Sequence, residues 1–366
     1  MALGRKTFRS GAAYGTLNRF VRTPHVPAKG NVVQPLKMQP VFKERVWGGR
    51  RLADLLSKTL PPDQRIGESW ELADHPQGRS LVAEGPLAGK TLRSILERHG
   101  AAVLGREQCM RGGAARFGLL VKFIDASDRL SVQVHPDDAY AEAHHLGESG
   151  KVECWTVVHA EPGASLIHGL KPGVTRAVFA HALKAGKIEE VLAGRPVKAG
   201  DFIWIPAGTV HTIGPGVVLA EVQQNSDVTY RVYDWNRRDL DGKPRELQVR
   251  EALETIRFGG DAMPSGGRGK TADETGLVID HLVDCHAFSL SRIQIDRRPW
   301  AADTDGAYVV VVVLAGSARL TTSEATLALR AGDTVLVPAD AQEYAIEQPQ
   351  KLAVLVAAPP GKTPTQ

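Results

Sequence analysis

The strongest constraint on the fold is a nine-residue segment that occurs twice. Ala199–Ala207 and Ala331–Ala339 both start with Ala-Gly-Asp, continue with four strand-forming residues and end with Pro-Ala. A glycine turn, a short strand and a proline turn in the same order predict one turn-strand-turn unit in two copies. Because turn residues and strand register agree over the whole segment, the repeat predicts two related β-sandwich, or jelly-roll, units in one chain.

The rest of the chain is typical of a mainly β protein. Its 366 residues are too many for one compact core, and 43% hydrophobic with 23% charged residues is an ordinary globular composition. From Phe117 onward, short β-branched or aromatic segments alternate with Gly and Pro turns, as strands do. Helical patterns interrupt them near Asp137–Leu146 and Thr175–Leu192. We predict two sandwiches with short helical insertions.

Shifts in composition indicate the domain boundaries. Up to residue 37 the chain has seven basic residues and no acidic one, and Met38 opens a more structured sequence. A disordered tail or an over-long start is the main interpretation, with a transit peptide as the alternative. The predicted organisation is a basic, disordered leader at 1–37, an N-terminal metal-binding sandwich with helical insertions at 38–258, a Gly-rich linker at 259–276, a degenerate C-terminal sandwich without a metal site at 277–360, and a tail at 361–366.

Charge and cysteine content exclude several kinds of partner. The formal net charge is +4, but the leader supplies the excess and the remainder is slightly acidic. We therefore expect no nucleic-acid and no membrane partner. The longest apolar stretch, Tyr308–Ala315, is too short to cross a bilayer. Three cysteines without a CxxC pair argue against a disulfide framework, so we predict a cytoplasmic protein. We expect it to be a monomer or a homodimer.

Metal-ligating side chains gather around the first copy of the repeat. In the segment Ser131–His135, alternation places Ser131, Gln133 and His135 on one face of a strand. Glu153 opens the next strong strand, and His211 follows the proline turn of the repeat. Two imidazoles, an amide oxygen and a carboxylate form a mixed N/O set, which suits zinc or another divalent first-row metal.

The second copy lacks such a set. His211 lies four residues after Ala207, whereas Glu343 lies four residues after Ala339 and has no metal-ligating neighbours of that kind. We therefore expect an active centre only in the first sandwich, with the second as a structural partner.

Four ordered motifs carry a family resemblance. They are Leu119–Asp138, Gly150–Trp155, Pro206–Gly214 and Gln224–Arg231. Together they resemble the type I mannose-6-phosphate isomerases in their shorter bacterial form, from about Met38 to Phe258 and more loosely beyond. The resemblance implies a cupin fold, one Zn²⁺ per chain, and interconversion of mannose 6-phosphate and fructose 6-phosphate.

The resemblance also implies a role for individual residues. The metal ligands fall on Gln133, His135, Glu153 and His211, the same four that strand alternation and donor chemistry indicate. The active-site residues fall on Arg231, Lys151 and Asp227. Positions associated with the substrate phosphate fall on Lys122 and Ser131.

Several alternatives stay open at this stage. The catalytic base is Asp227, Lys151 or a water on the ion, and Arg231 is a candidate to stabilise negative oxygen. Lys122 could instead point outward from an exposed strand, and Arg231 with Asp227 could form a structural ion pair. The rival functions are a metal-dependent cupin oxygenase and a non-catalytic sugar-phosphate-binding cupin.

Overall fold

The computed structural model describes residues 33–111, 116–259, 269–272 and 276–362. The leader up to residue 32, most of the predicted linker and the end of the tail lie outside the described residues. Two strands differ from the expected boundaries: β1 (Leu36–Gln39) begins before Met38, and β16 (Gly269–Ala272) lies within the predicted linker. Val33 and Leu36 are buried, so residues ahead of Met38 belong to the core.

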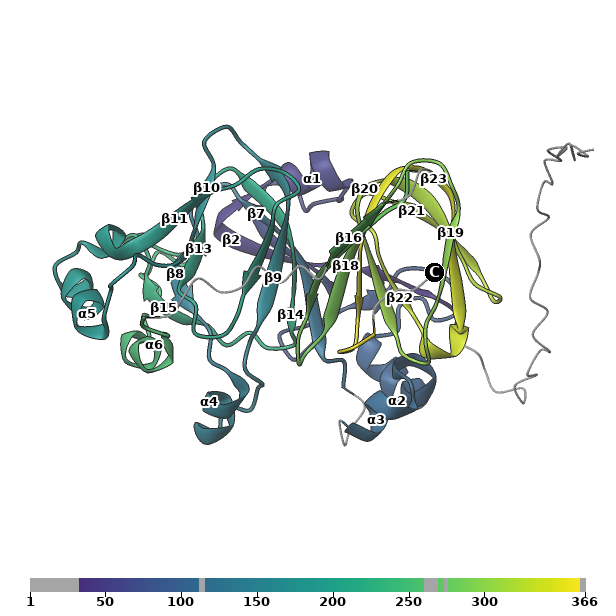
Figure 1. Cartoon of the computed structure of the whole chain (residues 1–366), viewed down its shortest axis with the longest axis horizontal. Coiled ribbons are helices and arrows are strands. Elements are labelled where there is room, and N and C mark those ends of the chain that lie inside the picture. Colours follow the sequence, from purple (N-terminus) through teal and green to yellow (C-terminus); the bar gives the residue numbers. More distant parts are fainter. Residues whose placement is uncertain (1–32, 112–115, 260–268, 273–275, 363–366) are drawn as a thin grey trace, which may run out of the picture. The chain divides into compact units, whose positions relative to one another are not determined.

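Two sheets form the first sandwich (Figure 1). The six-stranded sheet has the order β12-β9-β14-β7-β3-β2, with strands Phe202–Ile205, Glu153–Ala160, Val217–Gln224, Leu119–Ala126, Ile66–Leu72 and Val41–Gly49. The five-stranded sheet has the order β11-β10-β13-β8-β15, with strands Leu192–Pro196, Ser165–Leu170, His211–Ile213, Val132–Val134 and Tyr230–Tyr233. All neighbouring strands are antiparallel.

Helices are short and lie between strands, as the sequence predicts. They are α1 (Arg51–Leu56), α2 (Leu92–Leu104), α3 (Arg106–Arg111), α4 (Asp138–Ala143), α5 (Arg176–Lys184), α6 (Val249–Thr255) and the 3₁₀ turns η1 (Ile188–Val191) and η2 (Ala339–Ala341). Asp137 caps α4 and Thr175 caps α5, each accepting a backbone N–H in the first turn. Within the described residues, none of these helices is long and apolar enough to span a bilayer.

The strands of the second sandwich all belong to one ten-stranded sheet. The same sheet also includes β1 and β6 from the N-terminal part of the chain. Its main path is β16-β17-β18-β23-β20-β22-β1-β6, while β19 pairs with β23 and β21 with β20. The remaining bounds are Leu81–Val82 (β6), Val278–Asp284 (β17), Ser289–Ile295 (β18), Trp300–Asp303 (β19), Val309–Thr321 (β20), Thr326–Arg330 (β21), Thr334–Val337 (β22) and Glu343–Ala358 (β23). The strands β4 (Asp74–His75) and β5 (Gly78–Arg79), of two residues each, form a separate two-stranded hairpin.

The repeat has the same backbone geometry in both copies. Gly200 and Gly332 have φ values of 89° and 93°, which glycine adopts without strain. Next to them, the carboxylates of Asp201 and Asp333 each accept the N–H of the residue three positions back, at 3.0 and 2.9 Å. The shared Ala-Gly-Asp sequence therefore specifies one turn twice. The prediction of a mainly β fold with two sandwiches is confirmed.

Strand alternation divides the first sandwich into layers. On β7, Val121 and Phe123 belong to the core cluster that also contains Val310 and Leu355 of the second sandwich. Ile124 faces the other way, into a cluster with residues of the five-stranded sheet. That second sheet buries Val132, Val134 and their neighbours under α5 and α6. On β7, the side chains that alternate with Val121 and Phe123 therefore lie between the two sheets of the first sandwich. On β8, the same holds for the side chain between Val132 and Val134.

Candidate active site and metal centre

Charged side chains interrupt the apolar inner face of the six-stranded sheet. Lys122 on β7 is opposite Glu221 on β14 in the strand register, and Gln223 is opposite Glu153 on β9. All four are nearly inaccessible to solvent. Because burying a charge is costly unless it is paired, this polar layer requires compensating partners.

His135, Glu153 and His211 converge at the end of this layer. The Nε2 atom of His135 lies 3.5 Å from one oxygen of Glu153, and the Nε2 atom of His211 lies 3.3 Å from the other. Their ligand atoms lie within 4.8 Å of one another, and each side chain is at most 1% exposed. These residues form a buried candidate metal centre.

Hydrogen bonds orient both imidazoles toward Glu153. The Nδ1 atom of His135 lies 2.9 Å from the backbone oxygen of Val228, and that of His211 lies 2.9 Å from the oxygen of Thr209. A carbonyl oxygen only accepts, so Nδ1 carries the proton in both rings and Nε2 presents a lone pair. Burial lowers the pKa of His135, and it lowers the pKa of His211 to about 3, so both rings are neutral near pH 7.

The donor set fits a divalent cation. Both oxygens of Glu153 and the Nε2 atom of His135 are buried and have no hydrogen-bond partner among the described residues. Burial alone raises the pKa of Glu153, but the ammonium of Lys151, whose Nζ atom lies 3.0 Å away, outweighs it and holds this pKa well below its ordinary value. Neutral imidazoles and an ionised carboxylate are what first-row divalent metals bind.

Gln133 adjoins this centre on the neighbouring strand. It pairs with His211 in the strand register, and its amide nitrogen lies 3.2 Å from the Nε2 atom of His211. Its amide oxygen accepts a hydrogen bond from Ser131 at 3.3 Å. Half a turn of the amide exchanges the two atoms and directs the oxygen toward the ring nitrogens. All four predicted ligands are therefore brought together.

A cavity of about 450 Å³ opens beside the metal centre. Its lining includes all the remaining predicted site residues together with Gln133: Lys122, Ser131, Gln133, Lys151, Asp227 and Arg231. They come from β7, β8, β15 and three loops, so residues distant in sequence share one space.

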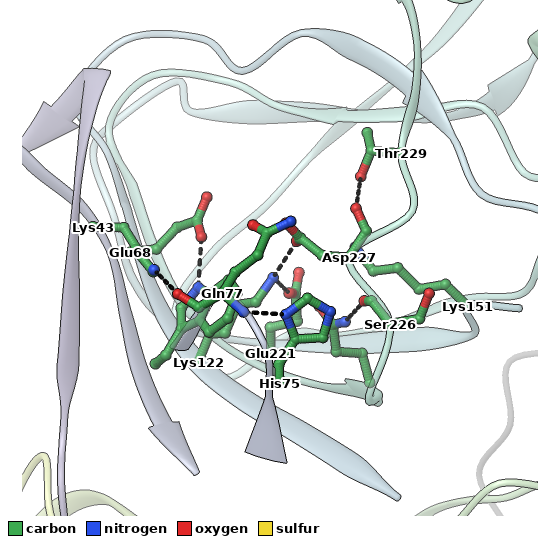
Figure 2. Close-up of polar contacts among 12 residues, drawn as sticks. Lys43, Glu68, His75, Gln77, Lys122, Lys151, Glu221, Ser226, Asp227 and Thr229 are labelled. Atoms are coloured by element: carbon green, nitrogen blue, oxygen red, sulfur yellow. Dashed lines mark hydrogen bonds and ion pairs between the residues drawn. The ribbon is translucent and has the colours of Figure 1, made fainter. Parts of the chain in front are cut away.

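Lys122 lines the cavity and lies between carboxylates (Figure 2). Its Nζ atom is 3.2 Å from Glu221 and 3.9 Å from Asp227. Burial alone lowers the pKa of Lys122, but Glu221, Glu68 and Asp227 outweigh it and raise this pKa. With a side chain only 5% exposed, Lys122 does not point outward from an exposed strand, and that alternative is wrong.

Comparisons with known proteins agree with this site. Residues 35–153 match the family model for the phosphomannose isomerase type I catalytic domain, and residues 278–357 match the mannose-6-phosphate isomerase cupin domain. The chain is 36% identical over 314 residues to mannose-6-phosphate isomerase ManA of Bacillus subtilis, covering 86% of this chain and 96% of that protein. This chain belongs to the type I mannose-6-phosphate isomerase family.

Further relatives place the chain in the same family. The mannose-6-phosphate isomerase of Streptococcus mutans is 36% identical over 84% of this chain and 93% of its own length. The crystal structure of the Bacillus subtilis mannose 6-phosphate isomerase matches with a TM-score of 0.81 and 32% identity, covering 89% of this chain and 99% of that one. The resemblance stated from the motifs and the predicted cupin fold are confirmed.

Arg231 and Asp227 of this family member are not paired with each other. Arg231 donates to the backbone oxygen of Glu246 at 3.2 Å, while the carboxylate of Asp227 faces Lys122. The Nε atom of Arg231 is buried and has no hydrogen-bond partner among the described residues. Burial and the neighbouring Arg245 lower the pKa of Arg231. The alternative of a structural ion pair between Arg231 and Asp227 is therefore wrong.

The predicted site set left out several charged residues of the cavity wall, among them Arg45, Glu68, Glu221 and Arg245. Arg45 pairs with Glu68 at 2.9 Å, Arg245 pairs with Asp234, and Glu221 accepts from the indole of Trp155 at 2.9 Å. A usable signal was present at Glu221, a charged residue inside the apolar run Val217–Val222. Glu68 lies in the segment Gly67–Trp70, whose resemblance to family positions near the pocket was a second signal. Arg45 gave no comparable signal, because polar residues are ordinary on strands near a sheet edge.

Proposed function

We propose that this chain interconverts mannose 6-phosphate and fructose 6-phosphate by proton transfer through an enediol, with one zinc ion held by Gln133, His135, Glu153 and His211. The observation that carries the proposal is the buried N/O donor set, in which three atoms have no hydrogen-bond partner among the described residues, beside a cavity lined by Lys122, Lys151, Asp227 and Arg231. Membership of the isomerase family and the names of its relatives support the choice of substrate.

A bound zinc ion would act as a Lewis acid on sugar oxygens. The protein's part is to keep the donors in place and in the right protonation state. The Val228 and Thr209 carbonyls orient the two imidazoles, and Lys151 keeps Glu153 ionised. This second layer of contacts makes the centre a rigid site.

The reaction moves a proton between C1 and C2, so a base must face those carbons. Two groups of this chain line the cavity and are candidates for this base: the Asp227 carboxylate, with Lys122 3.9 Å away, and Lys151. Lys151 can take the proton only as the neutral amine, so it would first have to give up the charge that it pairs with Glu153. Exchange of the substrate's C2 proton with deuterated solvent separates them. An Asp227→Asn variant that retains wild-type exchange excludes Asp227, and a Lys151→Met variant tests the amine in the same way.

Charge stabilisation and phosphate binding fall to the cationic groups. Arg231 has a permanent charge and lines the cavity, which suits the negative oxygen that develops in the enediol. Lys122 and Ser131 are proposed to contact the substrate phosphate. Both line the cavity, and the ammonium of Lys122 has three donors, so pairing with Glu221 leaves donors for a ligand.

A coupled assay with mannose 6-phosphate, with and without a chelator, tests the whole proposal. We expect turnover to fructose 6-phosphate, loss of turnover on chelation and recovery when zinc is added. Turnover that survives complete metal removal would contradict it, as would activity that requires O₂ and iron, which the oxygenase alternative predicts. Ligand binding without turnover would favour the binding-module alternative. Cytoplasmic location and oligomeric state stay predictions.

A further inference from the structure

The loop that carries Asp227 is held by a residue that the steps above do not use. The backbone N–H of Asp227 donates to the Oε2 atom of Glu148 at 2.7 Å. Glu148 lies three residues before Lys151, in the loop between α4 and β9. It is not part of the active-site wall and lines a neighbouring cavity instead. Glu148 therefore contacts Asp227 from outside the active-site cavity.

His75 lies on the other side of the Glu148 carboxylate. The Nδ1 atom of His75 accepts the backbone N–H of Gln77 at 3.2 Å (Figure 2). A nitrogen that accepts carries no proton, so the proton of the neutral ring is on Nε2. That atom lies 3.3 Å from the same Oε2 atom of Glu148, as an electrostatic contact without hydrogen-bond alignment. The ring is buried and packs edge-on against Trp70, so its position is fixed.

Other contacts join the two loops but do not reach Asp227. The hydroxyl of Ser226 donates to the backbone oxygen of Ser149 at 2.8 Å, and Gln224 accepts the N–H of Val152 at 2.9 Å. These bonds fix the chain on one side of Asp227. On the other side, the Val228 oxygen is committed to His135. Within its own loop, the Asp227 backbone oxygen accepts the hydroxyl of Thr229 at 3.3 Å (Figure 2). Among the described residues, Glu148 is the contact from the other loop that holds the Asp227 N–H.

We propose that Glu148, oriented by His75, is a positioning residue that holds the Asp227 carboxylate in the active-site cavity. Accepting the Asp227 N–H fixes the backbone from which the carboxylate projects toward Lys122. Misplacement of a reacting group by a fraction of an ångström is enough to slow catalysis without weakening substrate binding. The inference rests on the proposed function, in which Asp227 takes part in proton transfer.

Alanine and glutamine variants of Glu148 test the inference. We expect Glu148→Ala to lower kcat about tenfold while KM stays within about twofold and zinc content is unchanged. Glu148→Gln keeps an acceptor oxygen for the Asp227 N–H and should restore most of kcat. Glu97→Ala is the matched control, because Glu97 lines the same neighbouring cavity without contacting Asp227. Its kcat should equal that of the wild type.

Amide hydrogen exchange gives a readout that does not depend on activity. In Glu148→Ala the Asp227 amide should exchange about tenfold faster than in wild type and in Glu97→Ala, because it has lost its acceptor. Wild-type kcat and wild-type exchange in Glu148→Ala would overturn the positioning role and leave the proposed function intact. An inactive wild-type protein would refute the proposed function, and the exchange rates would still decide whether Glu148 holds the loop.

Discussion

The two sandwiches share a turn and a strand pattern but differ in what fills them. Between the sheets of the first, Lys122, Glu153 and Glu221 break the apolar rows and a cavity opens. The inner positions of the second, such as Val311 and Ile346, form an apolar cluster, and none of the fully buried side chains described in that sandwich is charged. The scaffold therefore supports either filling, and a site arises only where buried charges find partners and leave space.

The position after the repeated turn shows the difference at one residue. His211 is fully buried at the candidate metal centre, whereas Glu343, at the matching place in the second copy, is exposed. Within the described residues, the one group of three or more metal-ligating His, Cys, Asp or Glu side chains is in the first sandwich. The repeat therefore sets the backbone conformation in both copies. The side chains that follow it determine whether a sandwich has a candidate active site or only a structural role.

The largest expected effect comes from replacing His211 by alanine. The same replacement at the matched position, Glu343, serves as the control. His211→Ala removes a ligand, so bound zinc should be lost and kcat should fall below about 1% of wild type. Glu343→Ala is the control and should retain wild-type metal content and kcat. Metal analysis with the coupled assay measures both. Full turnover in His211→Ala would show that His211 is not needed for the reaction and that the two matched positions do not differ in function.

A cavity in the second sandwich should affect stability rather than chemistry. Ile346 is fully buried in the apolar cluster, so Ile346→Ala should lower the free energy of unfolding by about 2–5 kcal/mol. Urea unfolding measures this change. Since the second sandwich is expected to have a structural role, kcat measured on the folded variant at low temperature should stay within about twofold of wild type. A kcat loss with unchanged stability would mean that the second sandwich takes part in the reaction.

Lys122 tests the polar layer of the first sandwich. Lys122→Ala should raise KM about tenfold and lower kcat less, because the phosphate loses a charged partner. Lys122→Arg keeps the charge and should recover part of the affinity. The same steady-state assay serves both variants. An unchanged KM in the alanine variant would reject the phosphate role and leave Lys122 as the partner of Glu221 alone.

The smallest expected effect is an acid-stability contribution from Glu68. Burial alone raises its pKa, but Arg45 and Lys122 outweigh it and lower this pKa to about 2 from the ordinary 4.5. Because the folded-state pKa is the lower one, the stabilisation is present above pH 4.5 and is lost as the pH falls from 4.5 to about 2. Urea unfolding across that range should show a shallower loss in Glu68→Gln than in wild type. Glu343→Gln, which removes an exposed carboxylate, is the control, and equal slopes in Glu68→Gln and wild type would contradict the prediction.

Much of the site could be predicted because the relevant patterns are local. Alternation in Ser131–His135 put Gln133 and His135 on one face, since neighbouring residues of a strand must point to opposite sides. The Ala-Gly-Asp turn was readable twice because Gly200 and Gly332 need a positive φ.

Contacts between distant strands could not be predicted in this way. The pairing of β1 with β22 and the approach of Glu148 to Asp227 depend on which strands lie side by side. That choice is made by the burial of whole faces against each other, and no local pattern encodes it.

The sequence by itself determined the two-sandwich architecture, the four candidate metal donors and the family to which the chain belongs. Only the tertiary structure decided that Lys122 faces inward between Glu221 and Asp227, that Arg231 and Asp227 are unpaired, and that Arg45 and Glu68 join the cavity. The physical reason is that a side chain's charge state and partners depend on neighbours brought close in space, whereas its strand, turn and face depend on neighbours in sequence.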